Sequence, residues 1–415
     1  MRGLFGGLAI VTVAGGVLAV IAMQSHDLFA QANSSANSSA NLSASFSASS
    51  SAGSSSTSTA RSSSRTLVAD ADLQRDPPAT KTESQRWRLA SQFPITLPET
   101  GTLLAETIGR IETLNAGSLR LDITEPKDIA QPLDLFDAVA GGAFDAAFIW
   151  PATIKGRTAA FEIFGGIPFG PKASEFLAWH EKAGKALREE LYRAQNVHGM
   201  LCGMVAAGGT WFRKDVKEAQ DIDRLPVVAF GLAARTLAQF GAYPVTLAPG
   251  AIAKAYKEQK IVGAAFLSPV VDRQVMRGSD AKRYAFPSWS QHWAGLDLVV
   301  NLDTWTALPA RKRQTIENVC QANLATSLAQ SEAAQYDVLK DMIKDGVDVR
   351  RLPGSMVSAM RAAWGQVNET LQRDDPEFRR VWISLASFHE THALWRELTD
   401  TNPPPNPLSA SAVKP

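Results

Sequence analysis

The sequence contains only two cysteines, and Cys202 and Cys320 do not have the spacing of metal ligands. Two cysteines cannot form a disulfide framework either. One bridge would need an oxidising compartment, and we expect two buried thiols instead. No Gly-x-Ser-x-Gly, Cys-x-x-Cys or phosphate-binding loop is present. We therefore expect no enzyme activity, no cofactor and no metal site.

An excess of charge of one sign is also lacking. The chain has 42 Lys and Arg against 41 Asp and Glu, so its formal net charge is +1. This balance gives no electrostatic reason to expect nucleic acid binding. The 45% hydrophobic and 20% charged residues are typical of a globular protein, and 415 residues suffice for two domains plus extensions.

Only one long apolar run is present, at residues 4–23 behind Arg2. Its length of about 20 residues suits either a signal peptide or a membrane span. Ala30-Gln31-Ala32 offers a cleavage site of the small-x-small type. Residues 1–32 are therefore a cleaved signal peptide or an N-terminal membrane anchor. Either reading places the body in the periplasm, free after cleavage or tethered to the inner membrane.

The two flanks of the chain have the composition of unfolded segments. Residues 33–83 begin as a Ser, Ala and Asn tract with almost nothing to bury, so we expect a flexible tether. The Pro-rich residues 401–415 are expected to be a disordered tail. Order should begin near residue 84.

Strand and helix patterns alternate from that point. Expected strands cover residues 87–93, 119–123, 146–150, 227–230, 243–247, 263–267 and 298–302, with helical patterns at 102–114, 135–140, 231–240, 252–258, 309–344 and 357–399. The alternation indicates βαβ units and a largely parallel sheet. We expect residues 84–203 to form the first part of lobe I and residues 204–287 to form lobe II. Residues 288–400 should form a lobe-crossing strand followed by C-terminal helices. Two such lobes suggest a hinged α/β receptor with a cleft between them.

Eight collinear segments make a more specific identification possible. They are WRLASQFP from Trp87, LDLFDAVAGGAFDAAF from Leu133, GGIPFGP from Gly165, NVHG from Asn196, GTWFRKDV from Gly209, LAQFG from Leu237, PSW from Pro287 and VNLDTWTALP from Val300. Together they cover about residues 85–397 and resemble the solute-receptor (DctP) subunit of tripartite ATP-independent periplasmic (TRAP) transporters. The similarity is to the branch that binds 2-oxo acids and other monocarboxylates. It implies a periplasmic binding protein-like fold with hinge strands, a long helix bracing both lobes, and membrane permease subunits as partners.

The resemblance also implies a ligand site that has diverged here. In that branch an arginine holds the ligand carboxylate, and a cation beside it is bound by a glutamine and two acidic residues. The arginine falls on Val228, the glutamine near Ala207 or Gly208, the acidic residues on Ala265 and Gln291, an adjoining tryptophan on Phe266, and two pocket tyrosines on Ala152 and Thr153. Most of these offer no side-chain hydrogen bond or metal ligand. We therefore expect weak or no binding of pyruvate-like acids.

The candidate ligand-binding residues are those of this region: Trp150, Thr153, Trp211, Val228, Phe266, Trp289, Gln291 and Trp293. Ring faces among them could stack on a solute, although core packing is the alternative role for several, above all for Trp211. Arg235 could replace the missing cation or lie solvated on its helix. The leading hypothesis is a TRAP-type receptor that captures a small solute, such as an organic acid, by lobe closure. The alternative is a membrane-tethered scaffold or sensor that has kept the fold and binds a protein partner.

Overall fold

The structure is a computed structural model that describes residues 84–399. The predicted signal peptide or anchor, the tether and the C-terminal tail lie outside these residues. Within residues 84–399, no helix combines the length and the hydropathy needed to cross a membrane.

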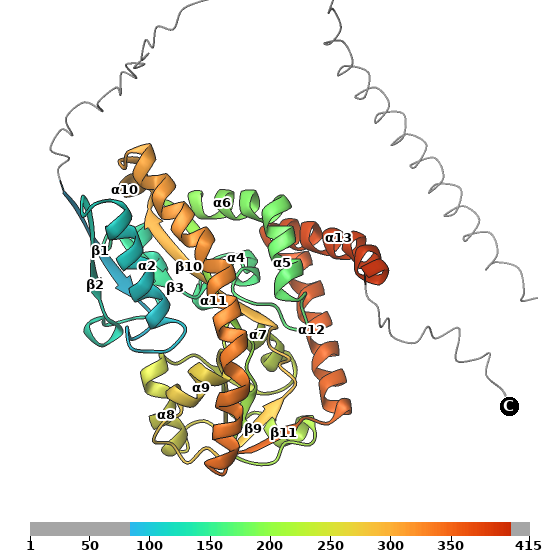
Figure 1. Ribbon diagram of the computed structural model, residues 1–415. Helices are drawn as coiled ribbons and strands as arrows, with labels where there is room; N and C mark the ends of the chain where they lie inside the picture. Colours follow the sequence, from blue (N-terminus) through green and yellow to red (C-terminus); the bar gives the residue numbers. More distant parts are fainter. Residues whose placement is uncertain (1–83, 400–415) are drawn as a thin grey trace, which may run out of the picture. The chain divides into compact units, whose positions relative to one another are not determined.

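The first sheet, which defines lobe I, has five strands in the order β2-β1-β3-β10-β4 (Figure 1). Its strands are β1 (Gln85–Ser91), β2 (Leu119–Thr124), β3 (Ala146–Ile149), β4 (Val197–Ala206) and β10 (Trp293–Asn301). β1 pairs in parallel with β2 and β3, whereas β10 pairs antiparallel with β3 and β4.

The helices of lobe I cover this sheet. They are α2 (Gly101–Leu114), α3 (Leu135–Ala140), α4 (Ala160–Ile163), α5 (Ala173–Trp179), α6 (Lys185–Arg193) and α10 (Leu302–Thr306), with short turns η2 (Pro126–Asp128), η3 (Pro151–Thr153) and η4 (His180–Gly184). In α2, the buried Leu104, Ile108 and Ile111 follow helical spacing, which gives the helix one apolar face.

The second sheet, which defines lobe II, has six strands in the order β11-β9-β5-β8-β6-β7. Its elements are β5 (Thr210–Phe212), β6 (Pro226–Val228), β7 (Tyr243–Val245), β8 (Gly263–Ala265), β9 (Arg283–Phe286), β11 (Asp348–Arg351), η5 (Ala219–Ile222), α7 (Gly231–Gln239), α8 (Pro249–Lys257) and α9 (Pro269–Val275). β5 runs antiparallel to β8 and β9, and the other three pairings are parallel.

The expectation of a largely parallel sheet is therefore wrong, because both sheets are mixed. The chain passes from lobe I to lobe II between β4 and β5, and it returns between β9 and β10. Of these strands, β4, β5 and β10 run antiparallel to all of their neighbours, and β9 runs antiparallel to β5. β4 was not predicted because nearly all of its 10 residues are buried and two are glycines, so it has no polar–apolar alternation.

Three long C-terminal helices join the lobes. α11 (Ala310–Lys344) packs against β4 and α2 in lobe I and against α9 in lobe II (Figure 1). This confirms the long bracing helix. The helical pattern over 357–399 is two helices, α12 (Gly354–Asp374) on α7 and α13 (Pro376–Thr399) on α4 and α5. Pro376 begins the second, and the Asp375 carboxylate accepts the Phe378 N–H.

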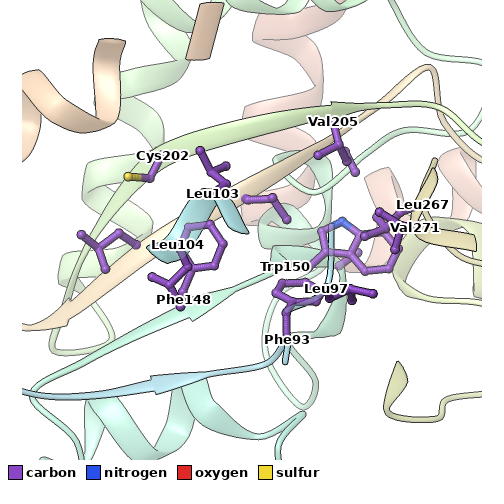
Figure 2. Packing of buried hydrophobic residues seen from close by; sticks show 14 of the residues in the cluster. Phe93, Leu97, Leu103, Leu104, Phe148, Trp150, Cys202, Val205, Leu267 and Val271 are labelled. Carbon is purple, nitrogen blue, oxygen red and sulfur yellow. The ribbon is translucent and has the colours of Figure 1, made fainter. Parts of the chain in front are cut away.

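One apolar cluster reaches from lobe I into lobe II. Figure 2 shows Phe93, Leu97 and Trp150 of lobe I close to Leu267 and Val271 of lobe II. The same cluster contains Cys202 and Cys320, which form a disulfide with their Cα atoms 4.1 Å apart. The expectation of two free thiols is therefore wrong. β4 lies along α11, and this packing joins two residues that are 118 positions apart in the sequence.

Candidate functional site

Three aromatic rings meet where the two sheets face each other. Trp150 directly follows β3 in lobe I, Phe266 directly follows β8 in lobe II, and Phe230 lies two residues after β6. In open α/β sheets, ligands bind outside the carboxyl ends of the strands, which is where these three side chains lie. The strand ends therefore mark the candidate ligand site between the lobes.

The three rings contact one another across the lobes. The ring centroid of Trp150 lies 5.0 Å from that of Phe230 and 5.7 Å from that of Phe266, and the two phenylalanine centroids are 5.5 Å apart. All three side chains are buried. Such tilted and edge-on arrangements are the favourable geometries for aromatic pairs. The contact surface of the closed lobes is thus aromatic at its centre.

A hydrogen-bonded network holds Trp150 in place. The Gln92 side chain, directly after β1, accepts from the Trp150 backbone N–H at 2.8 Å and donates to Thr153 Oγ1 at 2.8 Å. Thr153 in turn donates to the Trp150 carbonyl, and the indole N–H donates to the Gly165 carbonyl at 2.7 Å. Every polar group of the network is buried and paired, so the lobe I side of the site is rigid.

The lobe II side approaches this network through a glycine. Gly231 begins α7 with φ +50, and a Cβ there would lie 3.0 Å from the Ala152 Cβ and 3.1 Å from the Ala152 carbonyl oxygen. The position needs glycine both for its backbone conformation and for this close approach. Gln291, on the connection into β10, donates to the Phe266 carbonyl at 3.2 Å. These contacts bring the two lobes together around the rings.

The structure brings together five of the eight predicted site residues. Trp150, Thr153, Phe266 and Gln291 lie at the contact, and Val228 lies beneath it in the same buried cluster as Trp150 and Phe266. Val228 and Ala265 place no polar side-chain atom there, and within residues 84–399 no three His, Cys, Asp or Glu residues form a group that could hold a metal ion.

The other three predicted residues have packing partners of their own, although Trp211 belongs to the same large apolar cluster as Trp150 and Phe266. Trp211 stacks on Tyr284 with centroids 4.7 Å apart. The indole of Trp289 donates to Thr210 Oγ1, and that of Trp293 donates to the Pro171 carbonyl while its ring packs on Phe176. All three are core side chains here. The sequence could not distinguish these three tryptophans from Trp150, because a buried tryptophan has the same sequence context whether it packs in the core or contacts a ligand.

Two contributors to the site were not predicted, Phe230 and Gln92. Each lies one or two residues beyond the end of a strand. The rule that ligands collect at carboxyl strand ends would have found both if strand ends had been located to within a residue.

A charged pair also joins the lobes. Arg235 on α7 makes a two-pronged contact with Glu162 on α4, with Nε–Oε2 at 3.0 Å and Nη2–Oε1 at 2.8 Å. The Glu162 side chain is 5% exposed, whereas that of Arg235 is 43% exposed. Burial raises the pKa of Glu162, and the bonds from Arg235 oppose that shift. Arg235 is therefore not a free ligand-binding cation, although its side chain is partly solvated on its helix.

A second polar contact joins the lobes near α9. The Glu99 carboxylate accepts from Ser268, which caps α9, and from the Gln335 amide on α11 at 2.8 Å. Burial raises the pKa of Glu99, and both hydrogen bonds counter the shift. Three elements of the two lobes thus converge on one carboxylate.

Arg235→Met is expected to lower the free energy of unfolding by about 2–3 kcal/mol, because it leaves Glu162 buried without its cation while part of the pair is screened by solvent. Adding Glu162→Gln should recover part of this loss. Urea unfolding measures both. Arg193→Met is the matched control, since it breaks an exposed pair with Glu189 on one helix and should change stability by less than about 0.5 kcal/mol. An equal effect of both arginine variants would contradict the assignment.

Comparison with known proteins identifies the family. The model of the DctP family, described as bacterial extracellular solute-binding protein, family 7, matches residues 107–374. A curated relative from Nostoc sp., a monocarboxylate 2-oxoacid-binding periplasmic protein, is 24% identical over 320 residues, which are 76% of this chain and 87% of the relative.

Solved structures agree with this match. A TRAP transporter solute binding protein from Bordetella bronchiseptica, with copurified calcium and picolinate, is 25% identical to this chain and has a TM-score of 0.74. The match covers 80% of this chain and 99% of the Bordetella chain. A TRAP periplasmic solute binding protein from Pseudoalteromonas atlantica, with bound sodium and pyruvate, is 22% identical and has a TM-score of 0.73. The match covers 80% of this chain and 100% of the Pseudoalteromonas chain. The chain belongs to the bacterial extracellular solute-binding proteins of family 7 and has their two-lobed receptor fold.

Proposed function

We propose that this chain is the periplasmic solute receptor of a TRAP-type transporter. It captures a small solute between its lobes and delivers it to membrane permease subunits, with no covalent chemistry. The family match and the receptor fold support this role. Residues 4–23 would either direct export and be removed or tether the receptor to the inner membrane.

Recognition would rest on ring stacking and amide hydrogen bonds. The observation that carries this proposal is the contact of Trp150, Phe230 and Phe266 at the carboxyl ends of three strands. The Arg235 guanidinium, which joins the two lobes, is already bound to Glu162. A flat solute with a polar group suits ring faces flanked by the Gln291 amide, whereas none of the described residues at this contact offers a cation to a carboxylate.

Lobe opening would expose the binding surface. Trp150 comes from lobe I, and both phenylalanines come from lobe II, so separating the lobes separates the rings. A solute that enters between the lobes stacks on Trp150 on one side and on the two phenylalanine rings on the other. It therefore favours a closed form that differs from the one described here by the thickness of the solute. The Trp150 network stays within lobe I and keeps its ring oriented during the motion.

A matched pair of probes tests this proposal. Picolinamide and picolinate have nearly the same shape, but only picolinate is an anion. We expect calorimetry on the full-length protein to show tighter binding of picolinamide, without a requirement for sodium or calcium. Phe266→Leu should weaken that binding by about fivefold, the value of one aromatic contact. Picolinate or pyruvate binding that is tighter and depends on a cation would contradict the proposed recognition while leaving the receptor role intact.

The scaffold alternative shares the ring contact but has no support from the comparisons. It differs in its expected result, since a receptor fold that has lost its solute binds neither probe. Native mass spectrometry of the protein purified from its source would decide the point, because a retained small molecule supports the receptor and a stoichiometric protein partner other than a permease supports the scaffold.

A further inference from the structure

Lobe I contains a cavity of about 560 Å³ that is separate from the contact between the lobes. It lies among the α5–η4–α6 segment, the edge strand β4, α10 and the first half of α11. Its volume is within the range of small-molecule sites, which is roughly 300–1,000 Å³. None of the candidate solute-binding residues lines it.

Three buried side chains in the cavity wall have polar atoms without a protein partner. They are Nε of Arg188, Nε2 of His180 and both ring nitrogens of His198, in side chains of residues that are 2%, 7% and 8% exposed. Leaving a buried polar group unpaired costs about 1–3 kcal/mol. Native proteins avoid this cost, so several unpaired groups around one cavity indicate that something else pairs with them.

Arg188 is held in a fixed orientation. Its Nη2 lies 2.5 Å from Asp297 Oδ2 on β10, and Tyr192 donates a hydrogen bond to the same carboxylate. The ring of Tyr192 lies under the guanidinium, with the centroid 5.1 Å from Cζ. Nε–H has no protein partner, and Nη2 is in ionic contact with Asp297 Oδ2 without making a well-oriented hydrogen bond. The second oxygen of that carboxylate, Oδ1, is unpaired as well. A donor fixed in advance binds a ligand with little loss of side-chain freedom.

The potential at the two histidines is positive. Burial, followed by the charges of Arg188 and Lys185, lowers the pKa of His180 to about 3. Burial, followed by the charges of four cations beginning with Arg188, lowers the pKa of His198 to about 4. Both rings are therefore neutral at pH 7, each with one N–H donor. The rim itself is balanced, with Lys185, Arg193 and Arg313 against Glu181, Glu189 and Glu317.

The remaining walls are apolar. Met200 and Leu201 of β4 and Leu324 of α11 line the cavity, as does Trp305 of α10. The imidazole of His198 is stacked on the Trp305 ring, with centroids 4.1 Å apart and planes 9° apart. The site thus pairs a small cluster of fixed donors with a hydrophobic lining, the usual composition of a specific small-molecule pocket.

We propose that this cavity is a second ligand site, for a small organic anion with one carboxylate group and an apolar body. The carboxylate accepts from Arg188 Nε–H and from the N–H groups of His180 and His198. The body packs against Met200, Leu201 and Leu324. Because every wall belongs to lobe I or to the first half of α11, binding does not require lobe closure.

The test uses benzoate and its neutral analogue benzamide on the full-length protein. Benzoate should bind, and benzamide should bind at least about tenfold more weakly, since it lacks the charge that strengthens the hydrogen bonds. Ala325→Trp should abolish benzoate binding, because Ala325 is exposed at the cavity wall and the indole would fill it. Ala322→Trp is the matched control, an exposed position on the same helix that does not line the cavity, and it should leave binding unchanged.

A second variant tests the donors. His198→Phe keeps a ring against Trp305 but removes both nitrogens, and it should weaken benzoate binding by about tenfold or more. Imidazole NMR of the unaltered protein should show that benzoate raises the pKa of His180 and His198. The proposal is overturned if millimolar benzoate does not bind, if Ala325→Trp binds it as well as Ala322→Trp does, or if the imidazole signals do not respond.

Discussion

Reduction of the Cys202–Cys320 disulfide is expected to lower the free energy of unfolding by about 5 kcal/mol. The bond closes a loop across a sequence separation of 118 residues, and a cross-link of this span restricts the unfolded chain by roughly that amount. It also ties the edge strand β4 to α11, the helix that braces both lobes. Urea unfolding with and without a thiol reductant measures the difference, while mass spectrometry counts the free thiols.

The double variant Cys202→Ala/Cys320→Ala is the control for this measurement. It should be about as unstable as the reduced protein and should not respond to the reductant. If the unaltered protein keeps its unfolding midpoint while both thiols are demonstrably reduced, the packing of β4 on α11 stabilises the pair without help from the bond, and the expected contribution is wrong.

One buried carboxyl group, that of Asp272, should contribute a stability that falls as the pH rises from about 4 to about 7, opposite in sign to the contributions of the buried His180 and His198. Burial raises the pKa of Asp272 from 3.8 to about 7, although the Leu267 N–H and the Tyr284 hydroxyl donate to it. The folded protein therefore holds a proton that the unfolded chain releases in this range. When the folded protein binds more protons than the unfolded chain, the free energy of unfolding decreases as the pH rises. The Asp272 contribution should decrease by about 4 kcal/mol over this range and level off above pH 7, so it is measured as the difference between the unaltered protein and a variant that lacks the carboxyl group.

Asp272→Asn should remove most of this dependence, because the amide is neutral throughout and can still accept from the Leu267 N–H. Asp337→Asn is the matched control, since Asp337 is exposed on α11 and should keep the original slope. Urea unfolding at several pH values gives the slopes. A slope that is the same in Asp272→Asn as in the unaltered protein would show that Asp272 is ionised in the folded state.

The elements that the sequence predicted well are those with a local cause. α2 and α3 begin and end within one residue of the expected positions, and the long helix over 310–344 matches its pattern. In each, apolar spacing or a terminal glycine or proline acts within the segment itself. β4, β9 and β11 were not predicted, because their burial and pairing depend on strands far away in the chain.

The candidate site shows the same division. The resemblance carried by segments such as GTWFRKDV placed the site in the cleft between the lobes, and it placed Val228 where the related receptors have an arginine. It could not show that Arg235 is already paired with Glu162, that Phe230 completes the ring contact, or that Trp211, Trp289 and Trp293 pack elsewhere. The first two depend on which residues of the other lobe lie opposite, and the packing of the tryptophans depends on partners that are distant in the sequence.

By itself the sequence determined a two-lobed α/β receptor, since composition, periodicity and segment order are properties of the chain alone, and it predicts an export or anchor segment and a ligand region poor in charge. Only the tertiary structure decided the disulfide between β4 and α11, the aromatic contact between the lobes and the buried donors around the lobe I cavity. Each of these joins residues that are distant in the sequence, and their proximity results from the packing of whole sheets and helices.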